Sequence, residues 1–130
     1  MRVLVVNDDP AIRELLRDIL GEQGYRVTTA GDGLQALARL RVNTQPTVVL
    51  LDDRMPYMDG PTVLRTVAEE AHVAARSAFV LVSAAADAQA WLQDATRLSL
   101  PYPVALLTMP CSLDVALDLV AAAASHLPTP

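Results

Sequence analysis

The segment Val48-Val-Leu-Leu-Asp52-Asp-Arg-Met-Pro56-Tyr-Met-Asp-Gly60 decides the fold expected for this chain. Its four consecutive apolar residues, 48–51, are typical of a strand that is buried on both faces. The apolar run stops at Asp52, and a proline and an Asp-Gly pair follow, which indicates a loop. In open α/β sheets, ligands bind outside the carboxyl ends of the strands. Asp52 is therefore predicted to be a reactive or metal-binding carboxylate at a strand end.

Similar apolar segments recur on both sides of this strand, separated by segments with helical periodicity. Strands are expected at 3–6, 26–30, 47–51, 78–82 and 104–107. The expected helices carry apolar residues at helical spacing: Ile12, Leu15, Leu16 and Ile19; Leu34, Leu37 and Leu40; Val63, Leu64, Val67 and Ala71 within 61–72; Ala88, Trp91, Leu92 and Ala95 within 87–98; and a last helix capped by Ser112. Regular alternation of apolar strands and helices predicts a single (βα)5 α/β domain over residues 1–130, with a doubly wound parallel sheet of five strands.

Composition excludes several classes of protein. The net charge is −5, and all ten basic residues are scattered arginines, so a basic face for direct nucleic-acid binding is not expected. No apolar run has membrane-spanning length, and residues 1–7 are too short for a signal peptide. The only cysteine, Cys111, cannot form an internal disulfide. We expect a soluble cytoplasmic protein.

Acidic residues follow two of the predicted strands. Asn7, Asp8 and Asp9 follow the first strand, and Asp52 follows the third. If these parallel strands are neighbours, Asp8 and Asp52 face each other across a crevice, where oxygen ligands suit Mg²⁺. A carboxylate beside that cation can attack a phosphoryl group. The alternative is that Asp8 and Asp9 only cap the first helix.

Three sequence segments together resemble the receiver domain of response regulators. They are Val-Leu-Val-Val-Asn7-Asp8-Asp9-Pro-Ala-Ile-Arg, Leu-Leu-Asp52-Asp-Arg-Met-Pro-Tyr-Met-Asp-Gly and Val80-Leu-Val-Ser83-Ala84. The resemblance covers essentially the whole chain in order and spacing, and it implies the flavodoxin-like receiver fold. It also implies a non-enzymatic protein of a two-component phosphorelay, whose partner is a histidine kinase or a phosphotransfer protein.

The resemblance assigns roles to individual residues. Asp52 corresponds to the phosphoacceptor, and Ser83 to the hydroxyl that binds the incoming phosphoryl oxygen. Asp8 corresponds to the direct metal-binding acid, and Arg54 to the residue whose backbone carbonyl completes the Mg²⁺ site. Asn7 replaces a usual acid, so it is a weaker ligand and Mg²⁺ affinity should fall. Pro56 and Gly60 are expected to shape the loop without taking part in the chemistry.

The chain also departs from the family pattern at two positions after the fourth predicted strand. The family's lysine before a proline corresponds to Met109, and the chain contains no lysine at all. Leu106 stands where an aromatic switch residue is common. A further difference follows the third predicted strand, where Asp53 adds a second acid beside Asp52. The preferred hypothesis is an atypical receiver with weakened or absent phosphorylation that acts through protein–protein interaction.

Other functions and a partner surface are also predicted. The alternative function is a conventional receiver phosphorylated on Asp52; an aspartate-based phosphatase is less favoured, because its motif resembles Asp-x-Asp-x-Thr and Arg54 replaces the second acid. The face formed by the fourth helix, fifth strand and fifth helix is the expected surface for a homodimer or an output partner. The apolar loop 98–103, with Tyr102, is expected to be an exposed contact on that face, together with Leu106.

Overall fold

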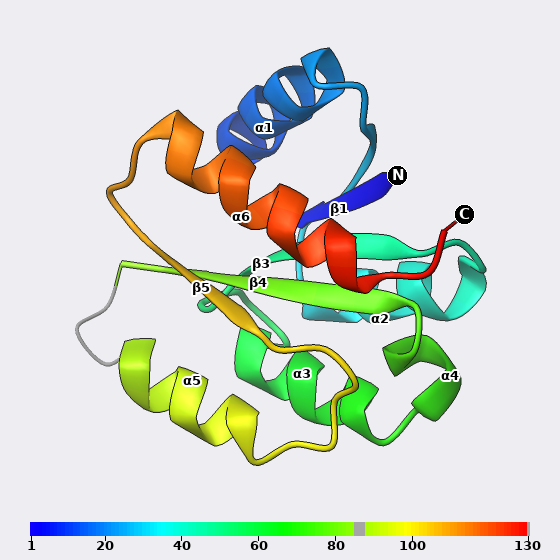
Figure 1. The fold of residues 1–130 in the computed structure, drawn as a ribbon. Helices are drawn as coiled ribbons and strands as arrows, with labels where there is room; N and C mark the ends of the chain where they lie inside the picture. The colour runs from blue at the N-terminus through cyan, green and yellow to red at the C-terminus, as the bar shows by residue number, and fades with distance from the viewer. Residues whose placement is uncertain (85–87, 130) are drawn as a thin grey trace.

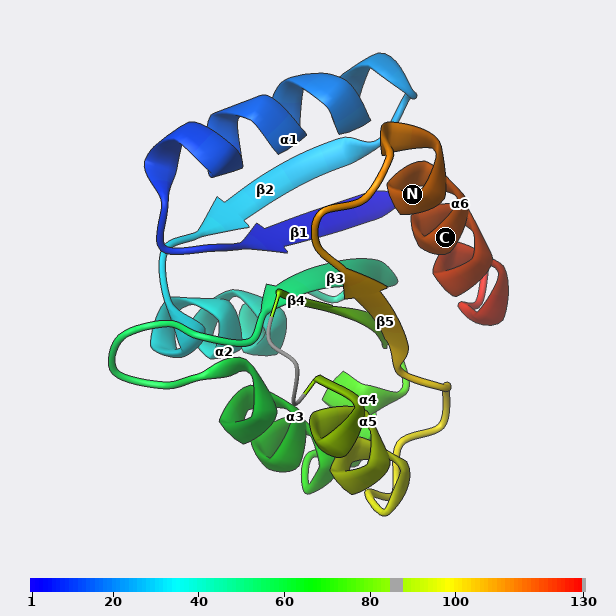
Figure 2. The ribbon, with the colours of Figure 1, turned by 90° about the vertical axis from the view of Figure 1, so that its left-hand side faces the viewer.

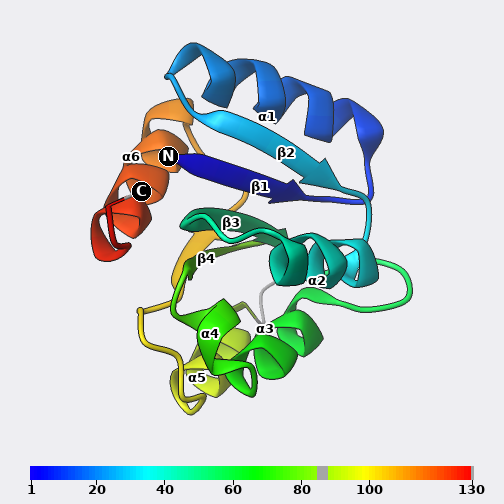
Figure 3. The same ribbon diagram turned by 90° about the vertical axis from the view of Figure 1, so that its right-hand side faces the viewer.

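The computed structural model describes residues 1–84 and 88–129, which form a parallel five-stranded sheet in the order β2-β1-β3-β4-β5. The strands are β1 (Arg2–Val6), β2 (Arg26–Ala30), β3 (Thr47–Asp52), β4 (Ser77–Ser83) and β5 (Ala105–Thr108). Helices α1 (Pro10–Glu22) and α6 (Leu113–His126) cover one face, and α2 (Gly33–Val42), α3 (Gly60–Ala68), α4 (Ala71–Ala74) and α5 (Ala88–Thr96) cover the other (Figures 1 and 3). The predicted doubly wound α/β fold is confirmed.

Alternation along the central strands divides the core into two layers. In β1, Val3 and Val5 pack on the face of α1 and α6, whereas Leu4 and Val6 pack on the opposite face. These four side chains are almost fully buried, as expected for a strand between two helical layers. The sheet is therefore a rigid platform whose strand ends hold their side chains in fixed places.

Polar side chains begin several of the helices. Asp9 Oδ1 accepts a hydrogen bond from the Ala11 N–H at 2.9 Å, and Ser112 Oγ accepts one from the Val115 N–H. Both caps were predicted from the sequence, because these residue types satisfy N–H groups that have no partner within the helix. The capping role predicted as an alternative for Asp9 is thus confirmed.

The helix predicted over 61–72 is interrupted at residues 69 and 70. Helix α3 ends at Ala68, and the short helix α4 begins at Ala71, so Ala71 is exposed while Val73 and Ala74 are buried instead. The Glu70 carboxylate receives two hydrogen bonds of 2.8 Å from the Arg41 guanidinium on α2. Glu70 has non-helical backbone angles (φ −113°, ψ 83°) as the N-cap of α4, and a periodicity pattern cannot reveal this break.

The apolar stripe predicted on the first helix is only partly buried. Leu20 is the buried residue of α1, while Ile12 and Leu15 are exposed. On α2, Leu34 is also exposed, because Ala36, Leu37 and Leu40 face the core. The expected helix start at Asp87 and the inward side chain of Ala88 lie outside the described residues.

Helices α1 and α6 share a face of the sheet but cover different strands. Helix α1 packs on β2 and β1, whereas α6 packs on β3, β4 and β5 (Figure 2). A cavity of about 830 Å³ lies between them and reaches the carboxyl ends of the strands. Ile12 and Leu15 of α1 line this cavity, which explains their exposure.

Candidate functional site

The strand order brings the predicted site residues to one edge of the sheet. β1 pairs with β3, with Val6 opposite Leu51, and β3 pairs with β4, with Asp52 opposite Val82. Asp8, Asp52 and Ser83 consequently lie just past or at the ends of adjacent strands. All three line the cavity between α1 and α6, together with Asn7 and Arg54.

Asp52 is half-buried at the end of β3, and its carboxyl group is less acidic than an ordinary aspartate. Burial raises the pKa of Asp52 to about 6, and the neighbouring charge of Asp53 raises it further, with a smaller contribution from Asp8. The Arg54 backbone N–H donates a hydrogen bond that acts in the opposite direction. Near neutral pH most of the Asp52 population is ionised, and the group is close to its titration range.

The oxygen donors at this edge include two carboxylates that could hold a divalent cation. The Asp8 and Asp52 carboxylates lie close enough to interact electrostatically, and Arg54 lines the same cavity. The Asn7 amide oxygen instead accepts a hydrogen bond from the Asp9 N–H at 2.9 Å. Within the described part of the chain, no three His, Cys, Asp or Glu side chains gather as a metal-binding group. Two carboxylates fit Mg²⁺, but with less negative charge than a three-acid site would supply.

Asp53 occupies a position whose importance the sequence did not reveal. Its carboxylate is buried and accepts a hydrogen bond of 2.6 Å from the Ser83 hydroxyl, which is also buried. Asp53 follows Val49 and Leu51 in the alternation of β3, which brings it beside Ser83, yet its side chain also interacts with the Asp52 carboxyl group and lines the same cavity. That alternation was a usable signal, but only the pairing of β3 with β4 brings Ser83 to the same place.

The loop after β3 is packed directly against the site. Asp59 caps α3 by accepting a hydrogen bond from the Thr62 N–H at 2.9 Å. Gly60 follows, and a Cβ there would lie 2.5 Å from the Asp52 carbonyl oxygen and 3.1 Å from the Asp53 Cα. Tyr57 has a positive φ of 68° and is largely exposed. The space around Gly60 agrees with the loop-shaping role expected for it.

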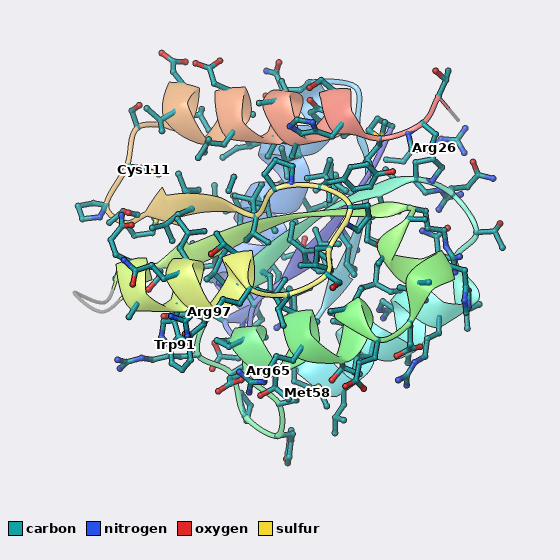
Figure 4. The ribbon with its side chains drawn as sticks, turned by 60° about the horizontal axis from the view of Figure 1, so that its bottom comes forward. Arg26, Met58, Arg65, Trp91, Arg97 and Cys111 are labelled. Carbon is teal, nitrogen blue, oxygen red and sulfur yellow. The ribbon has the colours of Figure 1, made fainter. Side chains whose placement is uncertain are left out.

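Met109 occupies the end of β5 beside the site. Its backbone N–H donates to the Ser83 carbonyl at 2.9 Å, and its side chain lines the same cavity as Asp8 and Asp52. Cys111 lies in the segment between β5 and α6 (Figure 4), and its sulfur is 3.4 Å from the Met109 sulfur. The position adjoining the acidic residues is thus filled by an uncharged thioether.

The predicted contact loop 98–103 packs some of its side chains on the protein, while Ser99, Pro101 and Pro103 are exposed. The Tyr102 hydroxyl donates to the Ala75 carbonyl at 2.6 Å, and the Tyr102 ring stacks on His126 with centroids 6.4 Å apart. Leu98, Leu100 and Leu106 pack against the core. Tyr102 and Leu106 are partly buried rather than fully exposed, and the role of the loop as a contact surface stays a prediction.

Exposed apolar side chains gather elsewhere, around the cavity. Ile12, Leu15, Met109 and Leu113 are each at least two-fifths exposed, and all four line the cavity between α1 and α6. Val115, the next exposed apolar residue on α6, does not line it. The apolar rim of this cavity therefore adjoins the acidic strand ends.

The parallel sheet with an acidic pocket at its carboxyl edge defines an α/β domain with a candidate site at its strand ends, and comparison with known proteins identifies the family. The model of the response regulator receiver domain matches residues 3–99, so the chain belongs to this family of two-component signalling. The chain is 54% identical over 68 residues to the transcriptional regulatory protein AruR of Pseudomonas aeruginosa. That alignment covers 49% of this chain and 28% of AruR, so the chain spans less than a third of that relative.

Solved structures agree with the family assignment. The receiver domain of the Francisella response regulator 1452 is 26% identical, with a TM-score of 0.80 over 96% of this chain and 97% of that one. The receiver domain of the sensor histidine kinase PA1611 from Pseudomonas aeruginosa has the same fold, with a TM-score of 0.77 at 20% identity over 95% of this chain and 97% of that one. That structure has a magnesium ion coordinated in its active site cleft. Among residues 1–84 and 88–129 of the present chain, none of the helices could cross a lipid bilayer.

Proposed function

We propose that this chain is an atypical receiver domain in which the phosphate switch is weakened or lost and which acts through protein–protein interaction. The observation that carries the proposal is the identity of Met109. Its side chain lines the cavity that holds Asp8 and Asp52, at the position where the family resemblance implies a lysine. Because the chain contains no lysine, no other residue of that type can take its place.

The missing ammonium group has a definite energetic cost. A charge-assisted hydrogen bond to a phosphoryl oxygen contributes roughly 1.5–3 kcal/mol, which corresponds to about one to two powers of ten in an equilibrium constant. Met109 supplies neither a positive charge nor an N–H donor. An acyl phosphate on Asp52 would therefore be less stable than in a receiver with the lysine.

The proposal includes a role for each residue at the strand ends. Asp52 is the phosphoacceptor, and the Ser83 hydroxyl binds a phosphoryl oxygen. Asp8, Asp52 and the Arg54 carbonyl hold Mg²⁺, with Asn7 as a weak further ligand. When bound, the cation offsets the repulsion between the two carboxylates and stabilises the negative charge of the transferring group. Their shared cavity also supports the alternative, a conventional receiver that is phosphorylated on Asp52.

The proposed partners follow from the family. The upstream partner is a histidine kinase or a phosphotransfer protein. The proposed surface for a homodimer or an output partner is formed by α5, β5 and α6. The domain itself is proposed to be cytoplasmic and without enzymatic turnover. A phosphatase of the Asp-x-Asp-x-Thr type is not supported, because Arg54 occupies the second acidic position.

A phosphodonor experiment tests this proposal. The wild-type protein is incubated with Mg²⁺ and beryllofluoride or acetyl phosphate, and an adduct is measured by fluorine NMR or by intact mass. We expect weak or absent binding, and we expect Met109→Lys to strengthen beryllofluoride binding by about tenfold or more. Met109→Gln is the matched control, since it adds a polar group without the charge.

The possible results separate the hypotheses. A stable wild-type adduct that Asp52→Asn abolishes would contradict the weakened switch and favour the conventional receiver. An absence of binding even in Met109→Lys would contradict the missing lysine as the cause of the weakened switch. Equal binding by the Lys and Gln variants would show that the missing charge is not the cause.

A further inference from the structure

We propose that Asp53 is a positioning residue that holds the Ser83 hydroxyl and thereby competes with a phosphoryl group on Asp52 for that hydroxyl. The inference rests on the proposed function, in which Asp52 is the acceptor and Ser83 a phosphoryl ligand. It identifies a second cause of a weakened switch that is independent of Met109.

The contact has the features of a strong charge-assisted hydrogen bond. The Ser83 Oγ lies 2.6 Å from Asp53 Oδ2, within the range expected for a hydroxyl that donates to a carboxylate. Asp53 is 6% exposed and Ser83 is 2% exposed, so water competes poorly for either group. A serine hydroxyl has one proton to donate. While that proton is directed to Asp53, it cannot be donated to a phosphoryl oxygen.

The backbone holds the Asp53 carboxylate where it is. The Asp53 N–H donates to the Val82 carbonyl at 3.1 Å, which ties the residue to β4 immediately before Ser83. The Asp53 carbonyl accepts a hydrogen bond from the Gly60 N–H, also at 3.1 Å, at the start of α3. Because the backbone on both sides of Asp53 is fixed, its carboxylate starts beside Ser83, and the 2.6 Å hydrogen bond must break before the hydroxyl proton can be donated to another anion.

Two substitutions at position 53 separate the hydrogen bond from the charge. Asp53→Asn removes the negative charge but keeps an oxygen that accepts a hydrogen bond from Ser83. Asp53→Leu removes both the charge and the acceptor at similar volume, and Asp53→Ala serves as a second acceptor-free variant if the leucine variant does not fold. Each variant is also made in a Ser83→Ala background, which completes a double-mutant cycle.

The experiment measures Mg²⁺-dependent beryllofluoride binding of each variant by fluorine NMR, and folding by circular dichroism and urea unfolding without ligand. Asp53→Leu should bind more tightly than Asp53→Asn by about tenfold when Ser83 is present. In the Ser83→Ala background the two should agree within about twofold, because no hydroxyl remains to be released.

Each other outcome overturns the inference in a recognisable way. Equal binding by the Asn and Leu variants with Ser83 present means that Asp53 acts only through its charge. The same tenfold advantage without Ser83 means that the hydroxyl is not involved. If Met109→Lys binds beryllofluoride but Asp53→Leu gains nothing, the inference fails while the proposed function stands. If Met109→Lys also does not bind beryllofluoride, the result contradicts the proposed function, on which the inference rests.

Discussion

Asp52 retains its proton at a pH where an exposed aspartate has lost it, and this property affects folding. Its pKa is raised to about 6, chiefly by burial and next by the charge of Asp53. A raised carboxyl pKa means that the native state binds a proton that the unfolded chain releases. The group therefore favours folding fully below about pH 4, and this contribution is lost as the pH rises through about 6.

The sign of this linkage gives a prediction for Asp52→Asn. The substitution should stabilise the protein relative to wild type at neutral pH by about 1 kcal/mol, a value reduced for solvent screening of a half-exposed group. The advantage should shrink toward pH 4. Urea unfolding of both proteins without divalent cations, at several values between about pH 4 and 8, measures the difference. A difference that stays constant with pH would contradict the shifted pKa.

The residues of the site differ in how far the sequence could predict them. The meeting of Asp8 and Asp52 followed from the expectation that their strands are neighbours, which the pairing of β1 with β3 confirms. The contact of Asp53 with Ser83 did not follow, since a carboxylate after a strand has the appearance of a polar loop residue. Only the pairing of β3 with β4 buries it against a hydroxyl 30 residues away.

At the scale of elements, the start of α3 packs closely against the end of β3 because the residue at position 60 has no side chain. Gly60 leaves no room for a Cβ beside the Asp52 carbonyl, and its N–H is bonded to Asp53. In contrast, a Cβ on Gly21, near the end of α1, would meet nothing within 4 Å. The two glycines therefore offer a matched comparison.

Gly60→Ala and Gly21→Ala should change stability in opposite directions. The first should destabilise the protein by about 1–3 kcal/mol, because the methyl group displaces backbone on β3. The second should stabilise it by about 0.5–1 kcal/mol, because alanine favours helix and restricts the unfolded chain. Urea unfolding of both variants tests the pair, and a stable Gly60→Ala protein would show that the loop can move away from Asp52.

Strands were easier to predict than helix boundaries for a physical reason. A central strand of this sheet is buried on both faces, so its apolar run alone marks its position, as Val48 to Leu51 shows. The break between α3 and α4 falls at Glu69 and Glu70, a residue type that is compatible with a helix, so neither composition nor periodicity marks it.

At the scale of the whole molecule, the separation of α1 from α6 leaves an apolar cavity open beside the acidic strand ends. The sequence predicted the amphipathic stripe of α1 but not that Ile12 and Leu15 would line a cavity instead of packing against a neighbour. How far apart two helices lie on one face depends on the packing of both against the sheet. Neither helix encodes that distance by itself.

The cavity predicts that the folded protein binds a small amphiphilic dye through its apolar rings. Anilinonaphthalene sulfonate should give a saturable fluorescence increase with native protein, and Leu113→Glu should weaken it. Val115→Glu is the control, because Val115 is similarly exposed (48% against 50%) on the same helix but does not line the cavity. Both variants should keep their unfolding free energies within about 0.5 kcal/mol of wild type. Equal loss of dye binding in both would contradict this location.

The backbone bond from Met109 to the Ser83 carbonyl has a practical consequence. Any event that displaces Ser83, the final residue of β4, should also displace Met109, which lies two residues before Cys111. That residue carries the sole sulfhydryl in the sequence. The rate at which a maleimide reacts with unmodified protein should thus record occupancy of the acidic edge, without the need for an engineered label.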